Sequence, residues 1–122
     1  MPKEKDFNQV FQGLKAIMEP FEKELVLKTN ESDNYYLDTH HKRKDGYVEA
    51  FGGVQVKKNY VSYHLMPVYA YPRLLETLSP ELKKRMQGKS CFNFTKIEAN
   101  TLKELKNLTK KGFEEFKKAK VV

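Results

Sequence analysis

Residues 54–65 read VQVKKNYVSYHL and carry the clearest β-hairpin pattern in the chain. Apolar and polar residues alternate on both sides of a tight turn at Lys58-Asn59, which is typical of paired antiparallel strands. Counting outward from this turn predicts the register pairs Val56 with Val61, Gln55 with Ser62, Val54 with Tyr63, and Gly53 with His64. A slip of one residue would turn the valines toward water, so the pattern fixes the register.

Further helices and strands are predicted on both sides of this hairpin. Apolar residues at helical spacing predict a helix over about residues 6–19, which Pro20 ends or kinks. Strands are expected at residues 25–29, at residues 35–39, from about residue 47 with a bulge at Gly52-Gly53, and at residues 91–95. Helical segments are expected at residues 71–77, from a Ser79 cap and Pro80 to a closing Gly88, and at residues 99–118 with Gly112 as a weak point.

This order of elements predicts an α+β fold. We expect a two-layer sandwich, in which an antiparallel sheet of about five strands is flanked on one face by the N- and C-terminal helices. A length of 122 residues favours a single domain, residues 1–122. Two long helices can cover only one face of such a sheet, so the other face must meet solvent, a ligand or a partner.

The composition favours a soluble, cytoplasmic protein. A single cysteine cannot form an internal disulfide, residues 1–6 are too charged for a signal peptide, and no uncharged run is long enough to span a membrane. The formal net charge is +7, but it comes from 20 Lys and only 3 Arg. Because Arg is the residue that reads base edges and forks onto phosphates, nucleic-acid binding is disfavoured.

Motifs that suggest chemistry are weak. Gly88-Lys89-Ser90 lacks the earlier glycine of a phosphate-binding loop, since Lys83 occupies that position. Cys91 has no second thiol, and strand alternation places it on the side opposite Phe92, beside Asn93. His64 faces a glycine that leaves room above it. The carboxylates form no obvious acid/base pair, so we do not expect an enzyme; a catalytic role for Cys91 or His64 is the alternative.

We therefore interpret the chain as a non-enzymatic binding module without cofactor or metal. The uncovered sheet face would bind a small anionic ligand or a protein partner, and the same face could form a homodimer. The candidate ligand-binding residues are Tyr36, Tyr60, Ser62, His64, Arg85, Lys89 and Cys91.

Three strings in the chain resemble a known family. Residues 60–69 (YVSYHLMPVY), 79–94 (SPELKKRMQGKSCFNF) and 34–39 (NYYLDT), together with the closing helix, are similar to the YdhG-like family of small bacterial domains of unknown function. This resemblance implies a frataxin-like fold of helix, sheet and helix. Some members carry an iron-chaperone label, so the resemblance implies iron delivery for iron–sulfur cluster assembly as an alternative function.

Iron binding of that kind would need exposed carboxylates on the first helix and the adjoining strand edge, because hard cations prefer clustered oxygens. The carboxylates available there are Glu4, Asp6, Glu19, Glu22 and Glu24, interspersed with Lys3, Lys5, Lys15, Lys23 and Lys28. With a net charge of +7, the field of the chain opposes a bound cation.

Overall fold

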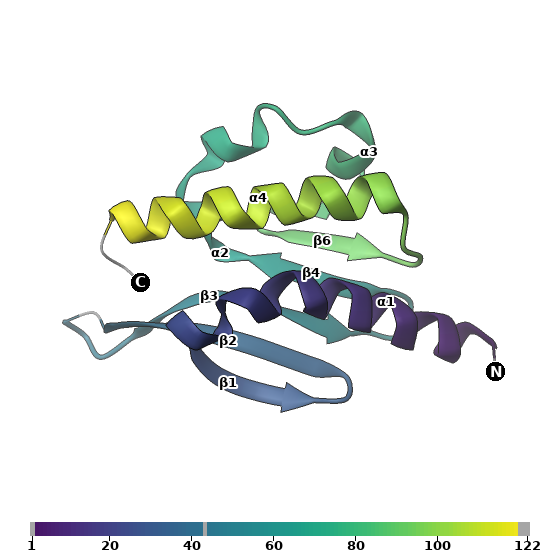
Figure 1. The fold of residues 1–122 in the computed structure, drawn as a ribbon, viewed down its shortest axis with the longest axis horizontal. Coiled ribbons are helices and arrows are strands. Elements are labelled where there is room, and N and C mark those ends of the chain that lie inside the picture. Colours follow the sequence, from purple (N-terminus) through teal and green to yellow (C-terminus); the bar gives the residue numbers. More distant parts are fainter. Residues whose placement is uncertain (1, 43, 120–122) are drawn as a thin grey trace.

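A single antiparallel sheet forms one layer of the molecule, and two long helices form the other (Figure 1). The computed structural model describes the backbone of residues 2–42 and 44–119, and side chains from residue 7 onward. Within this part of the chain the sheet has six strands in the order β1-β2-β3-β4-β6-β5. The strands are β1 (Val26–Glu31), β2 (Asn34–Lys42), β3 (Val48–Val56), β4 (Val61–Leu65), β5 (Met86–Gln87) and β6 (Cys91–Phe94).

The two long helices, α1 (Pro2–Met18) and α4 (Ala99–Lys118), lie on the same face of the sheet and pack against each other (Figure 1). The shorter helical segments are η1 (Glu19–Glu24), α2 (Met66–Ala70), η2 (Pro72–Leu75) and α3 (Pro80–Lys83). The predicted two-layer α+β architecture is confirmed. The strand that the sequence did not reveal is β5, which is too short to show an alternating pattern.

The register predicted for the central hairpin is also confirmed. In the β3–β4 pair, Val56 faces Val61, Gln55 faces Ser62, Val54 faces Tyr63 and Gly53 faces His64. The N–H of Lys57 donates to the carbonyl of Tyr60 at 2.7 Å and closes the turn.

Three register shifts interrupt the described part of the sheet, and one of them falls between Asp38 and Lys42 of β2. In the β2–β3 pair, Leu37 faces Gly52 and Asp38 faces Ala50, so the extra residue of the expected bulge is Phe51, one position earlier than Gly52-Gly53. In the β1–β2 pair the register shifts between Leu27 and Thr29, which leaves Lys28 as the extra residue on the edge strand.

The prediction that Gly88 closes the helix after Ser79 was wrong. Ser79 does cap α3, since its Oγ accepts from the N–H of Leu82 at 3.3 Å, but the helix ends at Lys83. The N–H of Arg85 donates to the Leu82 carbonyl at 3.0 Å in a tighter final turn, and the chain then enters β5. Gly88, with φ +83, lies instead in the turn between β5 and β6.

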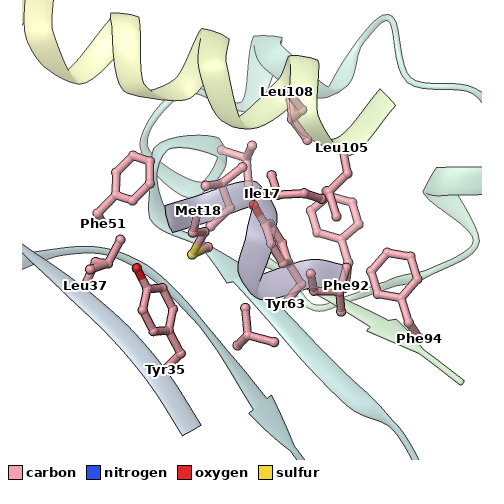
Figure 2. Close-up of a cluster of buried hydrophobic side chains, with 14 of the residues drawn as sticks. Ile17, Met18, Tyr35, Leu37, Phe51, Tyr63, Phe92, Phe94, Leu105 and Leu108 are labelled. Carbon is pink, nitrogen blue, oxygen red and sulfur yellow. The ribbon is translucent and has the colours of Figure 1, made fainter. Parts of the chain in front are cut away.

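The hydrophobic core lies between the sheet and the two long helices (Figure 2). Tyr35 and Leu37 of β2, and Tyr63 of β4, are 0% exposed and point toward the helices. Because side chains alternate along a strand, the residues between them lie on the other face. Within the described residues no long helix covers that face, and the candidate site lies there.

Candidate ligand site on the open face of the sheet

One row of residues crosses four adjacent strands on the open face. Tyr36 of β2 pairs with Gly53 of β3, Gly53 pairs with His64 of β4, and His64 pairs with Cys91 of β6. We call these four residues the aromatic row. They share a face because each alternates with a residue of the buried core.

A second, parallel row consists of uncharged polar side chains. Asn34, Gln55, Ser62 and Asn93 are successive partners across the same four strands, and we call them the amide row. Gln55 Nε2 donates to Asn34 Oδ1 at 3.3 Å. Carboxamide and hydroxyl groups each supply both donors and acceptors, so this row can bind a polar ligand through neutral hydrogen bonds.

The lack of a side chain at Gly53 lets the Tyr36 ring lie directly against the backbone of β3. A Cβ at this position would lie 2.4 Å from Cδ2 of the Tyr36 ring and 2.7 Å from the carbonyl oxygen of Tyr35. The Tyr36 ring therefore lies across a strand where any side chain would displace it. The Tyr36 and His64 rings are nearly parallel, with centroids 6.2 Å apart and an interplanar angle of 16°.

The aromatic row and three members of the amide row, Gln55, Ser62 and Asn93, form the floor of a concavity of about 380 Å³, whose rim is completed by Lys57, Tyr60 and Gln87. A further hollow of about 230 Å³ shares Tyr36 and Gln55 with it and continues to Lys28 and Thr29 on β1. Without this further hollow, the first concavity already lies within the range of roughly 300–1,000 Å³ that is usual for small-molecule sites. The open face is therefore hollowed rather than flat.

His64 contacts two potential donors, of which Cys91 lines the concavity. The Nδ1 of His64 lies 3.1 Å from Ser90 Oγ and 3.4 Å from Cys91 Sγ. Burial lowers the pKa of His64, so the imidazole is neutral at neutral pH. A neutral imidazole within hydrogen-bonding reach of a thiol is the arrangement that general-base activation of a cysteine requires.

The charges around the concavity are mainly cationic. Among the described residues that line the concavity, Lys57 is the one with a charged side chain. Lys28 lies nearby, with its Nζ 5.8 Å from the centroid of the Tyr36 ring. Asp38, two residues further along β2, is the carboxylate whose negative charge acts on the Tyr36 hydroxyl. Burial raises the pKa of Tyr36, and the Asp38 charge raises it further, so the phenol remains a hydrogen-bond donor.

Five of the predicted site residues meet in this concavity: Tyr36, Tyr60, Ser62, His64 and Cys91. Arg85 and Lys89 do not line it. The carbonyl of Arg85 accepts from the N–H of Asn93 at 2.7 Å, which places its backbone beside β6, and Lys89 is exposed in the following turn.

Six residues that line the concavity or contact His64 were not predicted from the sequence as site residues: Gly53, Gln55, Lys57, Gln87, Ser90 and Asn93. A signal was available for three of them. The hairpin register already placed Gly53 and Gln55 on the polar face, and alternation placed Asn93 beside Cys91. Gln87 gave no such signal, because its strand is only two residues long.

The carboxylates considered for iron are not clustered in the described part of the chain. Among those residues, no group of three or more His, Cys, Asp or Glu side chains lies close enough to hold a metal ion. The hydroxyl of Tyr35 donates to Glu22 at 2.7 Å, so this carboxylate has a structural partner. The side chains of Glu4, Asp6, Lys3 and Lys5 lie outside the described residues.

Within residues 2–42 and 44–119, none of the helices combines the length and the apolar character needed to cross a membrane. Comparison of the chain with protein-family models, with curated proteins and with solved structures gives no significant match. The likeness to the YdhG-like family stays a prediction.

Proposed function

We propose that this protein is a non-enzymatic module that binds a small anionic organic ligand on the open face of its sheet. The observation that carries the proposal is the concavity of about 380 Å³ in which the aromatic row and three members of the amide row, Gln55, Ser62 and Asn93, form one continuous floor. Such a floor combines ring surface with a few convergent polar groups, which is the usual composition of a ligand site.

A small ligand suits this surface better than a protein partner or a second copy of the chain. The cores of protein interfaces are enriched in aromatic residues, Met and Arg, and depleted of Lys, Glu, Asp, Ser and Ala. Here the Tyr36 and His64 rings lie beside carboxamides and a hydroxyl. Those groups are satisfied by a ligand that enters the hollow and not by a flat apolar surface.

The anionic character of the ligand follows from Lys57 on the rim, Lys28 beside Tyr36 and the net charge of +7. An exposed ion pair contributes only about 0–1 kcal/mol, and each neutral hydrogen bond about 0.5–1.5 kcal/mol. We therefore expect Lys57 to attract and orient the ligand, while the floor provides most of the affinity.

The proposal is tested by a thermal-shift screen with organic anions, their neutral analogues and ferrous iron. A ligand at 100 times its Kd adds about 2.7 kcal/mol, which raises Tm by several degrees in a domain of this size. Lys57→Gln should weaken binding by about two- to fivefold. Lys106→Gln, which makes the same charge change on an exposed position of α4, should not.

Cys91 gives an independent measure of occupancy, because it is the only cysteine in the chain and lines the concavity. A bound ligand should slow its alkylation by iodoacetamide, measured by intact mass. A selective Tm shift with iron, without protection of Cys91, would favour the iron-chaperone alternative instead. Concentration-dependent sedimentation with no response to any anion would favour a homodimer.

A further inference from the structure

We infer that the ligand is a flat heteroaromatic acid, meaning a planar ring with ring nitrogens or exocyclic polar groups and one acidic substituent. This inference rests on the proposed function and specifies its ligand class. Three features of the concavity support it: the aromatic rings, the carboxamide side chains and the small number of charged groups.

The rings give the site a planar apolar surface. Tyr36 lies across the backbone of Gly53, and its plane differs from that of His64 by 16°. The Tyr36 ring fills the space over Gly53, so the two nearly parallel rings offer a stacking surface for a flat group and little relief to hold a branched aliphatic one. Aromatic surfaces of this kind bind heterocycles by stacking, which tolerates many ring types.

The amide row gives the site side chains that can form hydrogen bonds with the edge of a heterocycle. Gln55 and Asn93 flank Ser62 on successive strands, so the row spans two strand spacings, about 10 Å. A carboxamide presents a donor and an acceptor side by side, and this pairing matches ring nitrogens and exocyclic groups of heterocycles. A purely hydrocarbon ring would cover the Ser62 hydroxyl and the Asn93 carboxamide without offering them a hydrogen bond.

The charges are too few to hold a simple inorganic anion. Lys57 is the charged group among the described lining residues, and Arg85 does not reach the concavity. Tight phosphate sites use bidentate Arg or several converging N–H groups. The acidic substituent is therefore placed at Lys57, while the ring supplies the larger part of the recognition.

The experiment compares matched probes by isothermal titration calorimetry. Nicotinate and adenosine 5′-monophosphate are the aromatic acids, and they separate a carboxylate source from a phosphate source. Cyclohexanecarboxylate and ribose 5-phosphate carry the same acidic groups without an aromatic ring. We expect at least one aromatic acid to bind roughly tenfold or more tightly than its non-aromatic counterpart.

Variants locate the effect on the open face. Tyr36→Leu should lower the affinity for the aromatic acid by roughly tenfold, whereas Tyr36→Phe, which keeps the ring, should retain most of it. Tyr69→Leu is the matched control, since Tyr69 is 55% exposed on α2 and lies outside the concavity. Gln55→Leu should lower the affinity by roughly threefold to tenfold, and Gln12→Leu on α1 should leave it unchanged.

The inference and the proposed function fail differently. Equal binding of aromatic and non-aromatic acids, with Cys91 still protected, would overturn the heteroaromatic ligand class and leave an anion-binding module. Loss of affinity in Tyr36→Phe equal to that in Tyr36→Leu would also overturn it. If no probe binds and Cys91 is never protected, the proposed function fails as well.

Discussion

A single buried hydroxyl pair connects the sheet to the C-terminal helix. Tyr63 is 0% exposed, and its hydroxyl lies 2.6 Å from Oγ1 of Thr109. The Thr109 hydroxyl donates to the carbonyl of Leu105 at 2.9 Å, so Tyr63 must be the donor to Thr109. Burial raises the pKa of Tyr63, which keeps the phenol protonated and able to donate.

Removal of the Thr109 hydroxyl should destabilise the fold more than removal of the Tyr63 hydroxyl. Thr109→Val leaves the buried Tyr63 hydroxyl without an acceptor and should lower the free energy of unfolding by about 1–3 kcal/mol. Tyr63→Phe should cost about 1 kcal/mol, because Thr109 keeps its bond to Leu105. Urea unfolding of both single variants and the double variant checks this. Strictly additive losses would contradict a direct bond between the two hydroxyls.

His64 should make stability depend on pH. Its pKa is lowered in the folded state by burial, so the unfolded chain binds more protons below its ordinary pKa of about 6.5. Above about pH 6.5 the imidazole is neutral in both states, and His64 costs no stability. As the pH falls from about 6.5 toward the lower folded-state pKa, the imidazole is protonated in the unfolded chain but not in the folded protein, so the free energy of unfolding declines. Urea midpoints between about pH 5 and 7.5 should show a steeper decline for the wild type than for His64→Gln.

The control for this comparison is His41→Gln, which removes an exposed imidazole outside the concavity. Identical profiles for the wild type and His64→Gln would mean that His64 is not desolvated in the folded protein.

At the scale of elements, α4 and α2 approach each other closely at a glycine. A Cβ at Gly112 would lie 2.8 Å from Cβ of Pro67. The position that reads as a weak point in the helix pattern is thus a contact between two helices. Helix propensity alone would favour alanine there by about 1 kcal/mol, but the close contact opposes it.

Gly112→Ala should lower the free energy of unfolding by about 1–3 kcal/mol, because Pro67 must move to admit the new methyl group. Asn107→Ala, at an exposed position of the same helix, should be neutral or slightly stabilising. Thermal unfolding of both variants measures the difference. A gain in Tm for Gly112→Ala would show that the two helices separate without cost.

How much the sequence revealed depended on the length and pattern of each element. The C-terminal helix was predicted with its observed bounds, residues 99–118, because an amphipathic pattern over twenty residues is unambiguous. The same reasoning placed the end of the Ser79 helix at Gly88, because a helix of one turn is too short to show the apolar spacing that would mark its last residue.

The candidate site followed the same rule. Ser62 and His64 were placed correctly because they lie on a hairpin whose register the valines fix. Arg85 and Lys89 were assigned to the site from a segment whose turns had been misplaced. The Tyr36 ring over Gly53 is a tertiary contact between strands, which no local pattern announces.

At the scale of the whole molecule, the excess of positive charge surrounds a nearly neutral hollow. A net charge of +7 attracts anions at long range, and this attraction is screened within about 8 Å at physiological ionic strength. The floor itself relies on ring surface and neutral hydrogen bonds, which salt affects little.

We therefore expect the affinity for an anionic ligand to fall only several-fold between about 0.01 and 0.3 M salt, and the fall to be smaller in Lys57→Gln. Calorimetric titrations at several salt concentrations measure this slope. A loss of several orders of magnitude would indicate a polyanion bound by many lysines rather than a small ligand in the hollow.

The irregularity at Lys28 bears on how the protein behaves at high concentration. A regular edge strand offers unpaired backbone groups to another sheet and invites aggregation. Here the β1 edge carries Val26 and Leu27, each 40% exposed, but the next residue is a bulged lysine that breaks the ladder. The opposite edge, β5, is two residues long and gives another strand little to pair with. Both edges are thereby protected against amyloid-like growth, and deleting Lys28 would expose an uninterrupted edge to self-association.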